Sequence, residues 1–127
     1  MLFRSNRRVW FLLGCDTLAP AGLVHKIGTY GMALAAHCAD TPVYALAGSE
    51  KLLLSIVRGA LDDGGPPDEL ISPSQPGVIV MNRYFDRTPF DLLAGVILPD
   101  GLHPPEAAAR RASAVTVHPS LADLLER

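Results

Sequence analysis

The sequence predicts one α/β domain built around a parallel sheet. Three short apolar runs, at residues 8–14, 43–47 and 78–81, alternate with segments in which apolar residues recur at helical intervals. Strands that alternate with helices in this way are typical of a parallel sheet. The chain has 127 residues, of which 49% are hydrophobic and 19% charged. That is enough apolar material for one buried core, and the chain is too short for two domains.

The first half of the chain is expected to form a strand, a loop, a helix and a second strand. The segment at residues 8–14, which is apolar without a break from Val9 to Leu13, indicates a strand that is buried on both faces. Residues 15–25 contain proline and glycine and are expected to form a loop. A helix is predicted over residues 26 to about 39, where apolar positions share one face, and a second strand over residues 43–47.

The next segment is expected to contain a helix, a long loop and a third strand. Residues 49–61 predict a helix with Ser49 as its cap. Residues 62–77 are polar and rich in proline and glycine, which indicates a loop. The apolar run at residues 78–81 predicts the third strand of the sheet.

A capping pattern predicts the start of a further helix. Thr88, Pro89 and Asp91 match the residue types favoured at the cap and at the first and third helical positions. A helix is therefore predicted over residues 89 to about 98. The remaining expected elements are a turn and two helices, at residues 99–101, 104–114 and 120–127.

Composition excludes several classes of function. The net charge of −2 does not favour direct nucleic-acid binding, and no run approaches the roughly 20 apolar residues of a membrane span. The four histidines show no metal-ligand spacing, and no cofactor signature is present, so neither a metal nor a cofactor is expected. Cys15 and Cys38 match neither a metal motif nor a disulfide framework, so a reducing compartment, the cytoplasm, is expected.

The N-terminal residues admit a second interpretation. Three arginines followed by an apolar run and Gly14-Cys15 resemble a short bacterial lipoprotein signal. The uninterrupted run at residues 9–13 is shorter than the roughly 7–15 residues of a working signal core. A buried strand explains the same residues more simply.

The start of the helix at Lys26 is a candidate anion site. The first turn of a helix presents free backbone N–H groups and the positive end of its dipole. Gly28 allows close approach to the backbone, while Thr29 and Lys26 add a hydroxyl and a charge, which together suit a phosphate. On spacing alone, an ordinary helix start with an exposed lysine is the favoured interpretation.

Two acids follow predicted strands. Asp16 comes just after the first strand and Asp86 follows the third. Ligands of open α/β sheets bind at the carboxyl ends of the strands, and a carboxylate there can serve as a general acid or base. The commoner role of such residues is to cap a turn or to begin a helix.

Two stretches resemble motifs of a known family. LLGCDTLAPAGLVHKIGTYGMALAAH resembles a G-A-D loop followed by N-K-I-G-T, and VMNRYFDRTPFDLLAGVILPDGLHPPEA resembles a segment that begins N-P-x-F-D-x-T-P. Both motifs are typical of the translation initiation factor 2B alpha, beta and delta subunits. That family also holds methylthioribose-1-phosphate isomerase and ribose-1,5-bisphosphate isomerase. The segment AGSEKLLL between them is more similar to the initiation-factor and ribose-bisphosphate branches, and the resemblance spans residues 9–107.

The resemblance implies a Rossmann-like fold of the ribose-phosphate-isomerase/CoA-transferase type, present in part. Residues 1–127 are then the C-terminal portion of an initiation-factor-2B-like domain. In the isomerases the aspartate of G-A-D is catalytic, and it matches Asp16. The following Asn-Lys pair, which helps to hold the sugar phosphate, matches His25 and Lys26. The residues expected to bind phosphate or substrate are His25, Lys26, Gly28, Thr29, Asn82 and Asp86.

The chain also departs from the family pattern. His25 replaces the asparagine, Arg83 stands where the family has proline, and VILPDG lacks the family's threonine–glutamate pair. The isomerases' catalytic cysteine lies upstream of the matched region, and neither Cys15 nor Cys38 corresponds to it. A fragment, a shortened family member or half of a split protein is therefore expected.

Two functions remain open at this point. One is a module that binds a sugar phosphate or nucleotide phosphate and assembles into a homo-oligomer or with a complementary N-terminal-half chain. The alternative is the C-terminal part of an aldose–ketose sugar-phosphate isomerase, of the ribose-1,5-bisphosphate or methylthioribose-1-phosphate type, which another segment or chain completes. The missing cysteine leaves open whether this chain is an enzyme.

Overall fold

A computed structural model describes residues 9–53, 64–72, 75–116 and 118–120. It contains a four-stranded sheet in the order β1-β4-β6-β7, in which the first three strands are parallel and β7 is antiparallel. The prediction of an α/β domain with a parallel sheet is therefore confirmed. The strands are β1 Phe11–Gly14, β4 Val43–Leu46, β6 Gly95–Leu98 and β7 Gly101–His103.

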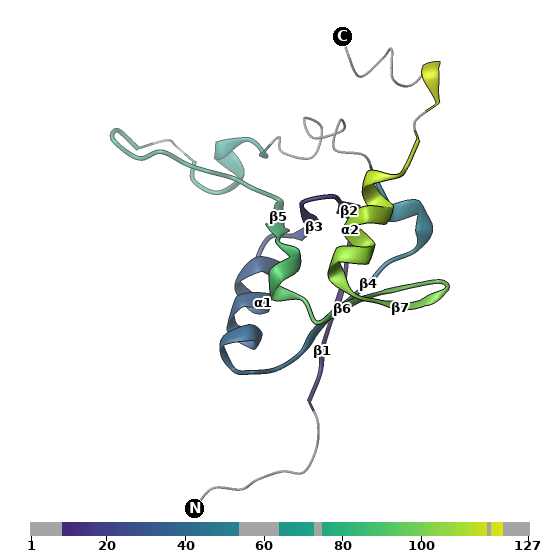
Figure 1. The fold of residues 1–127 in the computed structure, drawn as a ribbon. Coiled ribbons are helices and arrows are strands. Elements are labelled where there is room, and N and C mark those ends of the chain that lie inside the picture. The colour runs from purple at the N-terminus through teal and green to yellow at the C-terminus, as the bar shows by residue number, and fades with distance from the viewer. Residues whose placement is uncertain (1–8, 54–63, 73–74, 117, 121–127) are drawn as a thin grey trace, which may run out of the picture.

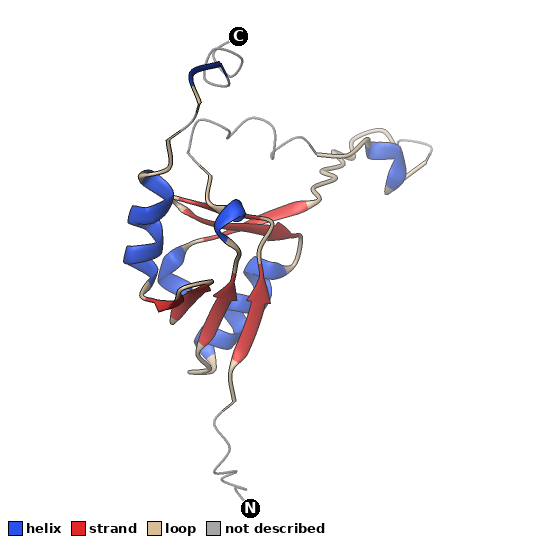
Figure 2. Ribbon diagram, turned by 90° about the vertical axis from the view of Figure 1, so that its right-hand side faces the viewer, coloured by secondary structure: helices blue, strands red, loops and turns tan. Residues whose placement is uncertain are grey.

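A second sheet of three antiparallel strands lies across the carboxyl ends of the parallel strands (Figure 2). Its central strand, β3, pairs with β2 on one side and with β5 on the other. The predicted loop at residues 15–25 is thus wrong, since these residues form most of a hairpin. The strands are β2 Thr17–Ala19, β3 Gly22–Lys26 and β5 Phe85–Thr88.

Two α-helices cover one face of the parallel sheet (Figure 1). Helix α1, Thr29–Cys38, contacts β1, β4 and β5, and helix α2, Pro105–Ser113, contacts β2 and β6. Both were predicted from the sequence, although α1 begins three residues later than expected because Lys26 still belongs to β3. Ala33 of α1 and Ala108 of α2 are fully buried in one core together with strand residues. Small residues let both helices pack close to the sheet.

The predicted helix at residues 89–98 is wrong. Only a 3-10 turn, Phe90–Leu92, follows Pro89, and the next four residues form β6. No side chain caps the turn, and the Thr88 side chain is fully buried. The capping residues do not start a helix because Val96 and Leu98 are buried in the centre of the sheet. Burial of these side chains in a strand stabilises the fold more than helix capping would.

Several further predictions need correction. Residues 78–81 lie outside every strand, and Ile79 is 90% exposed, so β6 takes the place expected for the third strand. Strand β1 is buried on one face only, because Leu12 is 58% exposed. Ser49 makes no capping bond and begins a 3-10 turn, Ser49–Lys51. Leu52 and Leu53 are not helical, and Leu52 forms a bridge with Leu18. Residues 54–61 of that predicted helix and 121–127 of the last one lie outside the described residues.

The core lies between the helices and the inner faces of both sheets. Its fully buried members include Leu18 and Leu23 from the small sheet and Val43, Ala45 and Val96 from the parallel sheet. Leu18 and Leu23 are direct partners across the β2–β3 pair. The hairpin is therefore fastened to the core through its inner face, which also fixes where its polar residues lie.

The opposite face of the parallel sheet is apolar and uncovered. Leu12, Leu46 and Leu102 are 58%, 50% and 61% exposed, and Leu46 and Leu102 lie in one row across the sheet. We call these three residues the open face. Parallel sheets in α/β domains are normally covered on both faces, so the open face is a surface where further protein can pack.

The hairpin turn predicts a glycine requirement at position 22. Gly22 has φ 139°, and a Cβ there would lie 2.3 Å from the Thr88 carbonyl oxygen. Gly22→Ala should therefore lower the free energy of unfolding by about 2–4 kcal/mol. Gly31→Ala is the matched control, because a Cβ at Gly31 meets nothing within 4 Å and alanine should stabilise helix α1 by about 0.5–1 kcal/mol. Urea unfolding measures both, and equal effects would contradict the hairpin.

Candidate functional site

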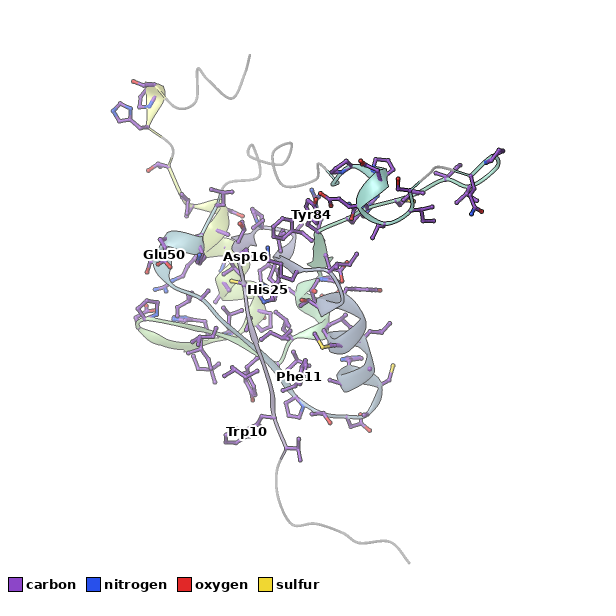
Figure 3. The ribbon with its side chains drawn as sticks, turned by 180° about the vertical axis from the view of Figure 1, so that it is seen from behind. Trp10, Phe11, Asp16, His25, Glu50 and Tyr84 are labelled. Atoms are coloured by element: carbon purple, nitrogen blue, oxygen red, sulfur yellow. The ribbon has the colours of Figure 1, made fainter. Side chains whose placement is uncertain are left out.

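Asp16 and His25 form a pair at the carboxyl end of β1. Asp16 comes between β1 and β2, and its backbone N–H donates to the Val24 carbonyl at 2.9 Å. His25 reaches it from β3, with Nδ1 3.0 Å from Asp16 Oδ2 (Figure 3). The two side chains remain 39% and 30% exposed. The pair is held by backbone structure yet open to a ligand.

Strand β3 directs His25 and Lys26 to opposite faces of the small sheet. Successive strand residues alternate between faces. His25 pairs in register with Asp86, and Lys26 pairs with Phe85. The Lys26 ammonium lies 4.1 Å from the centre of the Phe85 ring, a cation–π contact. The structure therefore brings His25 to Asp16 and places Lys26 on the other face.

Asp86 occupies the N-terminus of α1. Its Oδ2 accepts hydrogen bonds from the backbone N–H of Gly28 at 2.6 Å and of Tyr30 at 3.2 Å. These are the free donors and positive dipole end at which the sequence suggested a phosphate. An internal carboxylate thus already supplies the negative charge that this helix start favours.

Gly28 and Thr29 shape the turn into α1. Gly28 has φ 97°, a left-handed conformation that favours glycine. Thr29 is 1% exposed, and its hydroxyl donates to the Lys26 carbonyl at 2.6 Å. The hydroxyl that the sequence suggested as a ligand donor is therefore used inside the protein, where it closes the strand-to-helix connection.

Asn82 belongs to a different cluster. Its amide nitrogen donates to the Pro66 carbonyl at 3.0 Å and to Glu69 Oε2 at 2.7 Å, and the Tyr84 hydroxyl donates to the same Glu69 oxygen. The hydrogen bond from Tyr84 lowers the pKa of Glu69, and the one from Asn82 lowers it further by a smaller amount. The cluster fastens residues 64–72 to the approach to β5, and neither Glu69 nor Tyr84 was singled out from the sequence.

Neither cysteine is positioned as a reactive thiol of the site. Burial raises the pKa of Cys15 to about 11, so its thiol stays protonated at neutral pH. Cys38 is exposed at the end of α1. The described residues contain no group of three or more His, Cys, Asp or Glu side chains that could hold a metal ion. Within those residues no helix is long and apolar enough to span a membrane.

The pairing of His25 with Asp16 was not predicted from sequence, although a signal was present. In LVHK the buried Leu23 and the polar His25 are two residues apart, so a strand assignment would have placed both on one face. The expected loop hid this alternation. The chemistry of the observed site is a carboxylate–imidazole pair that can accept and donate hydrogen bonds to a polar ligand.

The chain is similar to methylthioribose-1-phosphate isomerases and to initiation-factor subunits. The profile of the Initiation factor 2 subunit family matches residues 9–105. A methylthioribose-1-phosphate isomerase from Synechococcus sp. is 35% identical over 112 residues, which cover 80% of this chain and 33% of that protein. This chain spans about a third of the length of the curated relatives it matches.

Solved structures show the same fold. The 5-methylthioribose 1-phosphate isomerase of Pyrococcus horikoshii superposes with a TM-score of 0.64 at 27% identity, over 84% of this chain and 33% of the other. Subunit delta of translation initiation factor eIF-2B from A. fulgidus superposes with a TM-score of 0.63 at 22% identity, over 80% and 33%. The predicted Rossmann-like architecture, present in part, is confirmed.

The capping role of Asp86 predicts a stability effect and a phosphate effect. Asp86→Ala removes the acceptor of two helix N–H groups and should lower the free energy of unfolding by about 1 kcal/mol. The freed N–H groups should then let inorganic phosphate raise the melting temperature of the variant more than that of the wild type. Asp86→Asn is the control, because it keeps an acceptor oxygen. An Ala variant that melts like the wild type, with or without phosphate, would contradict the cap.

Proposed function

The chain belongs to the initiation factor 2 subunit family, and from that premise we propose that it binds a phosphorylated sugar or nucleotide and assembles with further protein. Residues 1–127 then act as the C-terminal portion of an initiation-factor-2B-like domain. A second copy of the chain, or a complementary chain, packs beside it. The site residues proposed are Asp16, His25, Lys26, Gly28, Thr29, Asn82 and Asp86.

The Asp16–His25 pair is the observation on which the ligand proposal rests. It lies at the carboxyl end of β1, the edge where α/β sheets bind their ligands. Both side chains are partly exposed, and each has hydrogen-bonding capacity beyond their mutual contact. A sugar ring presents several hydroxyls that both donate and accept, so it matches such a pair.

The phosphate group of the ligand requires a cation. Lys26 follows His25 directly at the end of β3 and is exposed. Its four-carbon stem is flexible, so the ammonium can leave the Phe85 ring for a phosphate. In this proposal Asp16 and His25 bind the sugar and Lys26 binds the phosphate. Gly28, Thr29 and Asp86 hold the β3–α1 connection that presents them, and Asn82 steadies the approach to β5.

The assembly proposal is supported by the open face and by the edge of the sheet. Leu12 and Leu102 lie on opposite outer strands of the parallel sheet, and β1 pairs with only one strand among the described residues. An apolar edge strand of this kind favours pairing with another chain. Protein packed on the open face would also bury the exposed leucines.

A second candidate function is part of an isomerase. The curated relatives that match are methylthioribose-1-phosphate isomerases, and Asp16 corresponds to the aspartate that the family resemblance marks as catalytic. The resemblance also implies a reactive cysteine upstream. Buried Cys15, with a pKa of about 11, is a poor substitute. Aldose–ketose isomerisation would therefore need a further segment or chain to complete the site.

The ligand proposal predicts that Lys26→Ala weakens binding. Ribose 5-phosphate serves as the probe in isothermal titration calorimetry. Loss of one charge-assisted contact should weaken binding by about 1–3 kcal/mol. Arg110→Ala is the matched control, because it removes one exposed positive charge from helix α2, which contributes no residue to the proposed site. Equal affinities of the Lys26 variant and the wild type would show that the lysine does not contact the phosphate.

The assembly proposal predicts self-association through the open face. Size-exclusion chromatography with light scattering should give a mass above that of the monomer, and Leu12→Lys should shift it toward the monomer. Leu70→Lys is the matched control, since Leu70 is 59% exposed but lies outside the sheet. The same fractions should show no aldose–ketose isomerase activity on their own. A stable monomer with full isomerase activity would contradict both parts.

A further inference from the structure

We propose that Nε2 of His25, rather than Asp16, is the atom that accepts a hydrogen bond from a hydroxyl of the bound ligand. Asp16 is then a positioning residue that fixes the imidazole in the required form. This assignment takes the direct ligand contact from Asp16, which the family resemblance marks as catalytic, and gives it to His25, and it rests on the proposed binding of a phosphorylated sugar. Four features of the structure support it.

The first feature is the direction of the Asp16–His25 hydrogen bond. His25 Nδ1 lies 3.0 Å from Asp16 Oδ2. An ionised carboxylate can only accept hydrogen bonds, so Nδ1 must be the donor. A neutral imidazole with its proton on Nδ1 has a lone pair on Nε2. In the neutral ring, the Asp16 carboxylate therefore leaves Nε2 as the acceptor.

The second feature is that Nε2 has no partner inside the described part of the protein. Among the described residues, Asp16 is the ring's one hydrogen-bond partner, and it uses Nδ1. Asp86, the register partner of His25 across β3 and β5, does not compete. Its Oδ2 is bonded to the N–H groups of Gly28 and Tyr30.

The third feature is access. The His25 side chain is 30% exposed. Gly14, at the end of β1, lies beside the ring, and a Cβ on Gly14 would come 3.7 Å from Nε2 and 3.8 Å from Cε1. Because residue 14 is a glycine, it places no side chain against Nε2. A ligand at the carboxyl end of β1 can approach there.

The fourth feature is the contrast with His103. That ring points Nε2 at Asp100 Oδ1, 2.9 Å away, and the Arg111 guanidinium bonds the same carboxylate. His103 Nε2 also lies 3.4 Å from Arg111 Nη1, but its shorter contact is to the carboxylate, which favours a proton on Nε2, the opposite tautomer. The carboxylate contacts thus favour opposite proton positions in these two histidines, and of the two only His25 presents a lone pair on Nε2.

An acceptor nitrogen selects the chemistry of the ligand. A lone pair attracts a hydroxyl or an N–H group and repels an anionic oxygen. His25 should therefore meet a sugar hydroxyl and not the phosphate group, which Lys26 attracts on the other face of β3. A ligand that carries hydroxyls at a distance from its phosphate satisfies both residues.

The test is ¹⁵N NMR of the full chain with labelled histidine. The spectra are recorded at about pH 8, above the ordinary histidine pKa of about 6.5, with His25 assigned from His25→Gln. We expect the His25 Nε2 signal in the region of unprotonated ring nitrogens and the His103 Nε2 signal in the protonated region. Asp16→Ala should return His25 toward the Nε2–H form that free imidazole favours. Asp100→Ala, the matched control, should alter His103 alone.

Ribose 5-phosphate and inorganic phosphate are then added separately. Ribose 5-phosphate should move the His25 Nε2 signal toward the hydrogen-bonded region, and inorganic phosphate should not. A protonated Nε2 in the wild-type chain would overturn the inference without any ligand. Binding of ribose 5-phosphate with no change at Nε2 would also overturn it. If Nε2 is unprotonated as expected but ribose 5-phosphate does not bind, the proposed ligand-binding function is contradicted, and with it the acceptor role that rests on it.

Discussion

The antiparallel pairing of β3 with β5 determines where each polar residue of the site lies. Because side chains alternate along a strand, the register sets His25 and Asp86 on the inner face of the small sheet and Lys26 and Phe85 on the outer face. A shift of one residue would exchange these faces. The hairpin between β2 and β3 maintains the register, since Leu18 and Leu23 are both fully buried in the core.

The same pairing determines which groups remain for a ligand. Asp86 reaches α1 from β5 and satisfies the first N–H groups of the helix, so the helix dipole is already neutralised by a residue of the protein. Recognition of a ligand is therefore left to Asp16, which directly precedes β2, and to His25 and Lys26, which end β3. The Asp16–His25 pair is polar and partly exposed, whereas Lys26 provides charge on the other face. A ligand with separate hydroxyl and phosphate groups fits this division.

The sequence was sufficient for the elements that local pattern determines. Strands β1 and β4 and helices α1 and α2 follow apolar runs or helical periodicity, and Asp16 lies just after its strand as expected. The elements that depend on distant partners could not be predicted. Strand β5 pairs with β3 about sixty positions earlier, and β6 forms in place of a well-capped helix because its residues are buried between β4 and β7. The individual residues of the proposed site could therefore be predicted from the sequence. The face of the small sheet on which each of them lies could not, because it depends on the β3–β5 register.

The proposed site depends on one arrangement, in which His25 faces β1 and Lys26 faces away from it. Proton–proton Overhauser spectra of the labelled chain test it most directly, because they report only short distances. We expect cross-peaks between the His25 ring and the Gly14 α-protons, and between the Lys26 side chain and the Phe85 ring. Cross-peaks from the Lys26 side chain to Gly14, with none from His25, would show that the register is shifted and that the two residues face the other way.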